Sequence, residues 1–147
     1  MKSGLFLLAI FISIFVIISM GFSSCTSSET ILSASCDDFM KLQPNAVITK
    51  QIEIPVNGTL DVELCSNAST GFKWLEVAVI GDFKVMQQVN HSVTAPDSKG
   101  IVGAPGKETW VFKALKAGQC TISNEYSQPW QGGTKGSWKY IINVTVK

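Results

Sequence analysis

The chain has 147 residues, 46% of them apolar, and carries 12 Lys, no Arg, 11 acidic residues and a single His. This length suits one domain and excludes two of ordinary size. The near-zero net charge leaves no cationic face for nucleic acid. A single imidazole excludes a multi-histidine metal centre, and no motif calls for a metal or another cofactor.

The first 24 residues are an apolar leader. They hold 16 apolar residues and one charge, and 19 consecutive residues, 4–22, carry no charge at all. That run is long for a signal peptide and just long enough to span a bilayer. The segment Phe22-Ser23-Ser24-Cys25 resembles the lipobox of prokaryotic lipoproteins, in which the Cys becomes the lipid-bearing N-terminus. We therefore expect export, with a cell-surface or periplasmic lipoprotein anchored at Cys25 favoured over plain secretion or an uncleaved anchor helix.

A Ser/Thr-rich stretch, residues 25–43, is expected to tether a domain that comprises residues 44–147. If Cys25 carries lipid, three cysteines remain: Cys36, Cys65 and Cys120. Alternation places Cys65 on the polar face of its strand and Cys120 on the apolar face of its own, which disfavours a bridge between them. Cys36 can pair with either one, so the sequence leaves the pairing open.

The body of the chain predicts short β-strands separated by turns. The expected strands are 47–54, 59–65, 72–77, 83–88, 92–94, 107–115, 119–126 and 138–146. Apolar and polar residues alternate clearly in 60–64 and in 138–146, which gives each of these strands one buried face. Pro55-Val56-Asn57-Gly58 indicates a tight hairpin turn between the first two strands. Eight short strands in about a hundred residues indicate an all-β sandwich or barrel.

Four Asn-x-Ser/Thr sequons are present, at Asn57, Asn67, Asn90 and Asn143. They are candidate glycosylation sites in an organism that glycosylates exported proteins. Asn and Thr also suit turns and strands, so an incidental origin is at least as well supported.

Three connections carry residues that are unusual for simple turns. The first, Asn67–Gly71, is small and hydroxylic; the second, Gly100–Gly106, is rich in glycine and uncharged; the third, Gln128–Gly133, contains a Trp directly after a Pro. No helix follows the second, so it does not form a phosphate-binding loop. Trp130 fits equally well as an exposed interface anchor and as a cap folded back on the core.

Together these segments resemble the chagasin-type inhibitors of papain-like cysteine peptidases. The family pattern is NPTTG followed by an aromatic residue and a Trp, then GxGG, then PW or PF after a Tyr. Here the three read NASTGFKW (67–74), VGAPGKETWVFKALKAG (102–118) and YSQPW (126–130). The departures are Ala68 for Pro, Ser69 for Thr, Pro105 within the glycine motif, and Gln128 where many members have Arg. The resemblance covers residues 44–147.

The resemblance implies an immunoglobulin-like β-sandwich whose three loops form a wedge at one end and plug the peptidase cleft, without enzyme activity or cofactor, in a protein expected to be a monomer. It implies that Asn67–Gly71 enters the cleft beside the catalytic residues, that Gly103–Gly106 presents backbone, and that Trp130 covers apolar surface. Phe72 and Trp74 are expected to pack in the core beneath the first loop. The expected peptidase-binding residues are Asn67, Ala68, Ser69, Thr70, Gly71, Gly103, Ala104, Pro105, Gly106, Gln128, Pro129 and Trp130.

Two other classes of function remain as alternatives. An extracellular adhesion or carbohydrate-binding module would use Trp110 and Trp130 to stack on sugars. An enzyme would have to pair His91 with Cys65 or Cys120. His91 is expected in a turn, without an acidic neighbour to orient it, so a solvated surface His is the favoured interpretation.

Overall fold

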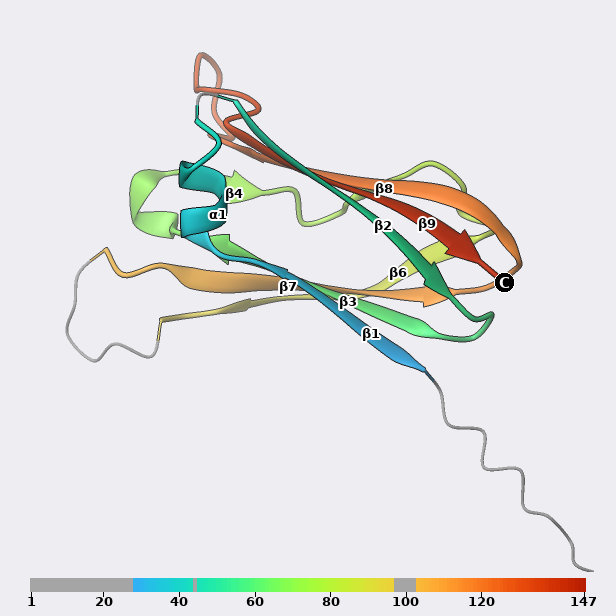
Figure 1. The fold of residues 1–147 in the computed structure, drawn as a ribbon. Helices are drawn as coiled ribbons and strands as arrows, with labels where there is room; N and C mark the ends of the chain where they lie inside the picture. The colour runs from blue at the N-terminus through green and yellow to red at the C-terminus, as the bar shows by residue number, and fades with distance from the viewer. Residues whose placement is uncertain (1–27, 44, 97–102) are drawn as a thin grey trace, which may run out of the picture.

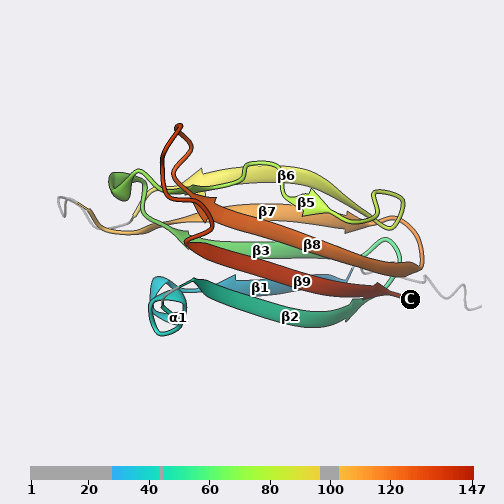
Figure 2. The same ribbon diagram turned by 90° about the horizontal axis from the view of Figure 1, so that it is seen from above.

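The computed structural model describes residues 28–43, 45–96 and 103–147. In these ranges the chain forms two β-sheets packed face to face, with one short helix at one end (Figures 1 and 2). The leader and Cys25 lie outside the described residues. None of the helices in the described part is long and apolar enough to cross a membrane.

Each strand belongs to one of the two sheets, and strands that are neighbours within a sheet are mostly not consecutive in the sequence. One sheet runs, in spatial order, β1 (Glu29–Ala34), β3 (Thr59–Ser66), β7 (Gly106–Ala114) and β6 (Met86–Thr94). The other runs β2 (Ala46–Ile54), β9 (Trp138–Val146), β8 (Gly118–Ser127) and β4 (Lys73–Trp74), with β5 (Val79–Ile80) also paired to β8. The pairs β1/β3 and β2/β9 are parallel, and the remaining pairs are antiparallel. The predicted all-β sandwich is confirmed.

The alternation read from the sequence faces the core as expected. Leu60, Val62 and Leu64 of β3 are at most 3% exposed, and the inward-facing residues of β9 from Tyr140 to Val146 are equally buried. Burying such side chains is the main favourable contribution to folding, at about 25 cal/mol per Å² of apolar surface. The hydrophobic pattern therefore fixes which face of each sheet is inside.

Several strand boundaries differ from the sequence expectation. The predicted strands 83–88 and 92–94 are one strand, β6, which continues through a bulge between Gln88 and Asn90. The predicted strand 72–77 shrinks to the two residues of β4. The turn at 55–58 exists, with Asn57 at φ 66°, but it is not a hairpin turn, because β2 and β3 belong to different sheets. It carries the chain from one sheet to the other.

The largest correction concerns the expected tether. Of residues 25–43, the segment 29–34 forms strand β1 beside β3, and Cys36–Met40 forms a single helical turn, α1. Ser35 caps α1: its hydroxyl accepts from the Asp38 N–H, and the Asp38 carboxylate accepts from the Ser35 N–H at 2.9 Å. The Ser35 hydroxyl also donates to the Asp38 carboxylate at 2.7 Å, and this hydrogen bond, together with the one from the Ser35 N–H, lowers the pKa of the Asp38 carboxyl. Residues 29–40 are thus part of the sandwich.

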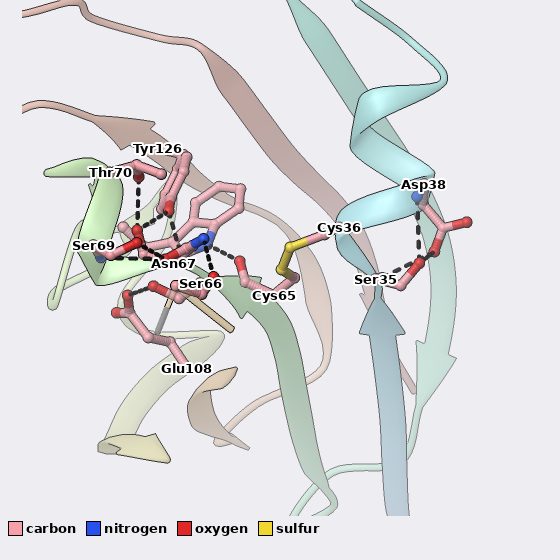
Figure 3. The surroundings of a disulfide bond; sticks show 12 residues. Ser35, Cys36, Asp38, Cys65, Ser66, Asn67, Ser69, Thr70, Glu108 and Tyr126 are labelled. Atoms are coloured by element: carbon pink, nitrogen blue, oxygen red, sulfur yellow. Dashed lines mark hydrogen bonds between the residues drawn. A yellow bond between two sulfur atoms is a disulfide. The ribbon is translucent and has the colours of Figure 1, made fainter. Parts of the chain in front are cut away.

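A disulfide joins Cys36 of α1 to Cys65 near the end of β3 (Figure 3). It settles the pairing that the sequence left open, and within the described residues Cys120 is the free cysteine, buried in the core. The cross-link closes a loop of 29 residues, for which chain-entropy reasoning gives a stabilisation of roughly 3 to 4 kcal/mol. It holds α1 against the strand that leads into the first predicted loop.

Stacked aromatic rings run from α1 to the first loop. Phe39, fully buried on α1, stacks on Trp138 at 4.8 Å; Trp138 stacks on Tyr126 at 4.7 Å; and Tyr126 stacks on Phe72 at 5.5 Å. We call these four rings the aromatic column. Trp74, only 1% exposed, packs against Phe39, Tyr126 and Trp138 from the core side. The expectation that Phe72 and Trp74 support the first loop from within is confirmed, although Phe72 is only partly buried.

Candidate functional site

The three predicted segments emerge at the same end of the sandwich (Figures 1 and 2). Loop 1 (Asn67–Gly71) follows β3, loop 2 (Gly103–Gly106) leads into β7, and loop 3 (Gln128–Gly133) follows β8. Residues 100–102, which complete the second predicted segment, lie outside the described residues. All twelve expected peptidase-binding residues are described, and they lie in these three loops.

Loop 1 is a compact turn held by its own side chains. Ala68–Thr70 form a 3₁₀ turn, and the Asn67 side-chain oxygen caps it by accepting from the Ser69 N–H at 3.2 Å and the Ser69 hydroxyl at 2.6 Å. The Thr70 hydroxyl donates to the Asn67 carbonyl at 2.6 Å. Gly71 ends the turn at φ 75°, a conformation that a residue with a Cβ adopts only at a cost. Figure 3 shows this network.

Asn67 also connects loop 1 to the rest of the molecule. Its side-chain N–H donates to the Gly103 carbonyl of loop 2 at 2.9 Å. Its backbone N–H donates to the Tyr126 hydroxyl at 2.9 Å, and that hydroxyl donates to the Asn67 carbonyl at 3.3 Å. Tyr126 is 3% exposed and belongs to the aromatic column. Asn67 therefore caps loop 1, donates a hydrogen bond to loop 2, and is hydrogen-bonded to the buried Tyr126.

Loop 3 is closed by polar contacts at its base. The Gln128 N–H donates to the Thr134 carbonyl at 2.8 Å, and the Gln128 side-chain oxygen accepts from the Thr134 N–H at 3.0 Å. The Lys135 ammonium donates to the backbone carbonyls of Gln128 and Trp130. The Gln128 side chain, expected to face a peptidase, is thus already engaged in holding its own loop.

Trp130 brings loop 3 against loop 1. It is 50% exposed and is not part of the hydrophobic core, so the structure favours an exposed anchor over a cap on the core. A Cβ added at Gly71 would lie 2.6 Å from the Cη2 atom of the Trp130 ring. The absence of a side chain at Gly71 is what lets the indole lie on loop 1.

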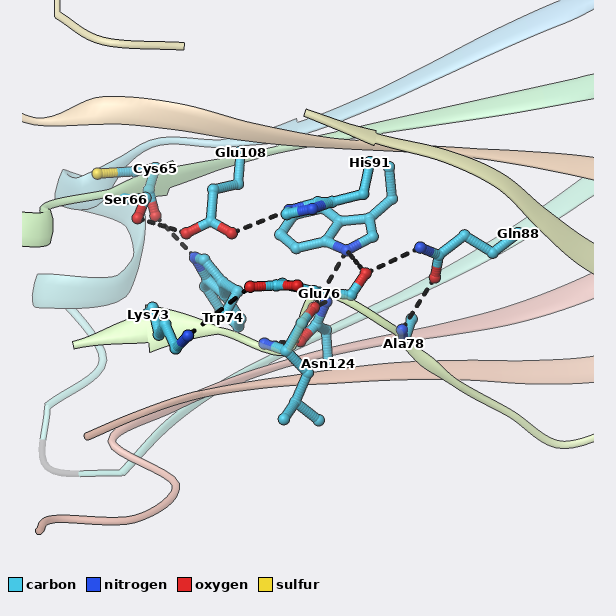
Figure 4. Close-up of polar contacts among 12 residues, drawn as sticks. Cys65, Ser66, Lys73, Trp74, Glu76, Ala78, Gln88, His91, Glu108 and Asn124 are labelled. Atoms are coloured by element: carbon cyan, nitrogen blue, oxygen red, sulfur yellow. Dashed lines mark hydrogen bonds and ion pairs between the residues drawn. The ribbon is translucent and has the colours of Figure 1, made fainter. Parts of the chain in front are cut away.

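Beneath the loops, three polar side chains are linked in a row, two of them buried and the third, His91, partly buried (Figure 4). The Ser66 hydroxyl donates to one Glu108 oxygen at 2.6 Å, and the other oxygen lies 3.1 Å from the His91 Nε2 atom. The expectation for His91 is wrong in two respects: it lies within strand β6, and it has an acidic partner. Its ring also packs on Trp110 at 4.9 Å. The alternation of β6 is too weak to reveal this inward-facing side.

These polar groups do not form an enzyme centre of the kind considered above. Cys65 is in the disulfide and Cys120 is buried, and neither is a hydrogen-bond partner of His91. Across the described ranges, no group of three or more His, Cys, Asp or Glu residues is placed to hold a metal ion. The chain Ser66–Glu108–His91 instead links β3, β7 and β6 directly below loops 1 and 2.

Two residues that position the loops escape sequence reasoning. Tyr126 is an ordinary inward-facing residue in the alternation of β8, and only its hydroxyl contacts reveal its role. Lys135 lies five residues beyond Trp130 and carries no motif. The Tyr126 contact joins residues 59 positions apart, so the motif that contains Tyr126 marks its position but not its role. The Lys135 contacts lie within loop 3, but their acceptors are backbone carbonyls, which no side-chain pattern reveals.

Comparison with known proteins identifies the family. The sequence pattern of the Chagasin family peptidase inhibitor I42 matches residues 53–144, a range that includes all three loops. Amoebiasin-2 of Entamoeba histolytica is 32% identical over 96 residues, covering 65% of this chain and 76% of that protein. Chagasin of Trypanosoma cruzi is 27% identical over 93 residues, covering 62% and 84% respectively. This chain belongs to the chagasin family of peptidase inhibitors.

Solved structures show the same fold. The crystal structure of EhICP2, a cysteine protease inhibitor from Entamoeba histolytica, matches with a TM-score of 0.61 at 22% identity, covering 81% of this chain and 97% of that one. PbICP-C, solved in complex with falcipain-2, matches with a TM-score of 0.52 at 24% identity, covering 82% and 100%. The chagasin-type, immunoglobulin-like sandwich implied by the motifs is confirmed.

Two tyrosine hydroxyls provide a matched test of how loop 1 is held. Tyr126→Phe removes the group that binds both backbone atoms of Asn67, so we expect the free energy of unfolding to fall by about 1 to 2 kcal/mol. Tyr140 is the control, because its hydroxyl is buried and has no hydrogen-bond partner among the described residues. Burial raises its pKa to about 12. Tyr140→Phe removes an unsatisfied group and should leave stability unchanged or slightly higher.

Urea denaturation of both variants checks this expectation. Equal losses of stability in the two variants would mean that the Tyr126 hydroxyl has no special role in holding loop 1.

Proposed function

We propose that this protein is a reversible, non-covalent inhibitor of papain-like cysteine peptidases, which it blocks by inserting loops 1, 2 and 3 into the active-site cleft. Membership of the chagasin family supports inhibition, and the similarity to EhICP2, a cysteine protease inhibitor, supports cysteine peptidases as the target class. The observation that carries the proposal is the contact of loop 1 with both loop 2 and loop 3 at a single end of the sandwich.

Loop 1 is the centre of the proposed wedge. Ala68, Ser69 and Thr70 are all exposed at its tip. The hydroxyls of Ser69 and Thr70 donate their hydrogen bonds to oxygen atoms of Asn67, so toward a peptidase they offer lone pairs as acceptors. The 3₁₀ turn differs from an extended substrate backbone, which explains how loop 1 can occupy a cleft without presenting a correctly placed scissile bond.

Loops 2 and 3 flank loop 1. Gly103 has φ 85° and Pro105 lacks an N–H, so loop 2 offers small residues and backbone carbonyls. Trp130, half exposed beside loop 1, presents the largest apolar surface of the three loops. Aromatic anchors of this kind dominate the binding energy of many interfaces. Loops that already hold their bound shape lose little entropy on docking, which favours tight binding.

The carbohydrate-binding alternative is disfavoured by Trp110. Its side chain is 1% exposed, and its indole N–H donates to the backbone carbonyls of Leu75 and Glu76. It therefore cannot stack on a sugar together with Trp130.

Titration of papain tests the proposed function. We expect inhibition at near one-to-one stoichiometry and no effect on a serine peptidase. Trp130→Ala should weaken inhibition by about 1 to 2 kcal/mol or more, and should leave the melting temperature nearly unchanged because the side chain is outside the core. Unchanged inhibition by Trp130→Ala, or loss of stability in its place, would remove Trp130 from the binding surface. Equal action on the serine peptidase would contradict the target class.

We also propose that the protein is exported and anchored by lipid at Cys25, with the sandwich outside the cytoplasm. The disulfide between Cys36 and Cys65 supports an oxidising compartment. In cells that produce the full chain, Cys25→Ser should move the protein from the membrane fraction to the soluble or secreted fraction. Retention of the variant in the membrane fraction would favour an uncleaved leader helix as the anchor.

A further inference from the structure

A pocket of about 390 Å³ lies at the loop end of the sandwich, beside loop 1. Its apolar lining includes Met40 of α1, Phe72 after loop 1, Pro105 of loop 2 and Trp138 at the start of β9. Asn67 and Thr70 of loop 1 contribute polar atoms. The volume lies at the small end of the range of pockets that bind small ligands. None of the expected binding motifs predicts it, because its outer wall comes from α1.

The lining defines what the pocket can receive. No residue that lines it carries a charge, and most of its accessible surface is apolar. A charged group would lose its hydration there without gaining a partner of opposite charge. An uncharged apolar side chain fits this lining best, with the polar atoms of Asn67 and Thr70 left at one side.

The pocket is continuous with the three-loop surface. Asn67, Thr70 and Pro105 belong both to its lining and to loops 1 and 2. In Figures 1 and 2, α1 lies at the same end of the molecule as the loops, and in Figure 2 it lies on the side of loop 1 away from loop 3. A partner that covers loop 1 therefore also reaches the pocket.

Two contacts fix the α1 wall. The disulfide holds Cys36 to Cys65, two residues before Asn67. The Phe39 ring, fully buried, stacks on Trp138, which itself lines the pocket. Met40 lines the pocket, is 54% exposed and is not part of the hydrophobic core. The disulfide and the Phe39 stack therefore fix the position of α1, while the exposed Met40 side chain remains accessible to a partner.

We propose that this pocket is a fourth contact with the target, which receives an apolar side chain that projects from the rim of the peptidase's active-site cleft. Such a contact discriminates among peptidases, because a target with a charged or missing side chain at that point of the rim leaves the pocket unfilled or forces a charge into it. The inference rests on the proposed function, since it places the same peptidase on loop 1.

Met40 and Leu42 offer a matched pair of substitutions. Both are about half exposed, at 54% and 49%, but Met40 lines the pocket and Leu42 does not. Met40→Asp should raise the inhibition constant for papain about tenfold or more, as expected for a charge placed in an apolar contact, with an unchanged melting temperature. Leu42→Asp should leave inhibition within about twofold of the unsubstituted chain.

The inhibition measurements distinguish failure of the fourth contact from failure of the proposed function. No inhibition of papain by the unsubstituted full chain would overturn the proposed function, and the pocket's role with it. Full inhibition that Met40→Asp leaves unchanged would overturn the fourth contact alone. Equal weakening by both substitutions would also overturn it, since the effect would then come from charge near α1 and not from the pocket.

Methyl NMR shows whether papain covers the pocket. With labelled methionine in the full chain, the Met40 methyl signal should shift when papain binds, while that of Met86, fully buried in the core, should stay in place. In the free chain, a soluble paramagnetic agent should broaden the Met40 signal. Protection of Met40 before papain is added would mean that this chain itself fills the pocket. A shift that follows protein concentration alone would indicate a second copy. Either result would overturn the proposal.

Discussion

The arrangement of the loop end depends on the hydroxyl of Tyr126. It accepts a hydrogen bond from the Asn67 N–H and donates one to the Asn67 carbonyl, while its ring is clamped between Trp138 and Phe72. Asn67 in turn caps the 3₁₀ turn and binds loop 2. The core thus fixes the position of loop 1 through the Tyr126 hydroxyl, and the position of loop 2 through Asn67. Trp130 adds loop 3 by lying on Gly71.

Electrostatics contributes little to recognition by this surface. The tips of the three loops carry no charged side chain, and the nearby ammonium of Lys135 is engaged by two backbone carbonyls of loop 3. Below the loops, Glu108 is buried but is satisfied by Ser66 and His91. Shape, backbone hydrogen bonds and the Trp130 ring therefore have to supply affinity, with only weak steering of the encounter.

Sequence reasoning predicted the sandwich and the three loops but not the contacts among the loops. Strong alternation in β3 and β9 marked the core, and the order of the motifs marked the loop end. β1 was missed because it buries only Ala34 fully, so its pattern resembles a polar linker. α1 was missed because one turn with a single buried residue, Phe39, has no measurable period. The contacts of Asn67, Tyr126 and Trp130 join residues tens of positions apart, and local patterns carry no information about them.

The central claim is that the three loops act as one preassembled surface, and the contact between Gly71 and Trp130 tests it most directly. Gly71 and Gly132 both have positive φ, at 75° and 77°, so an Ala at either position carries a similar backbone cost. Only at Gly71 would the new Cβ meet the indole, because nothing lies within 4 Å of a Cβ at Gly132. We predict that Gly71→Ala raises the inhibition constant for papain about tenfold or more relative to Gly132→Ala. Equal inhibition by the two variants would contradict the account.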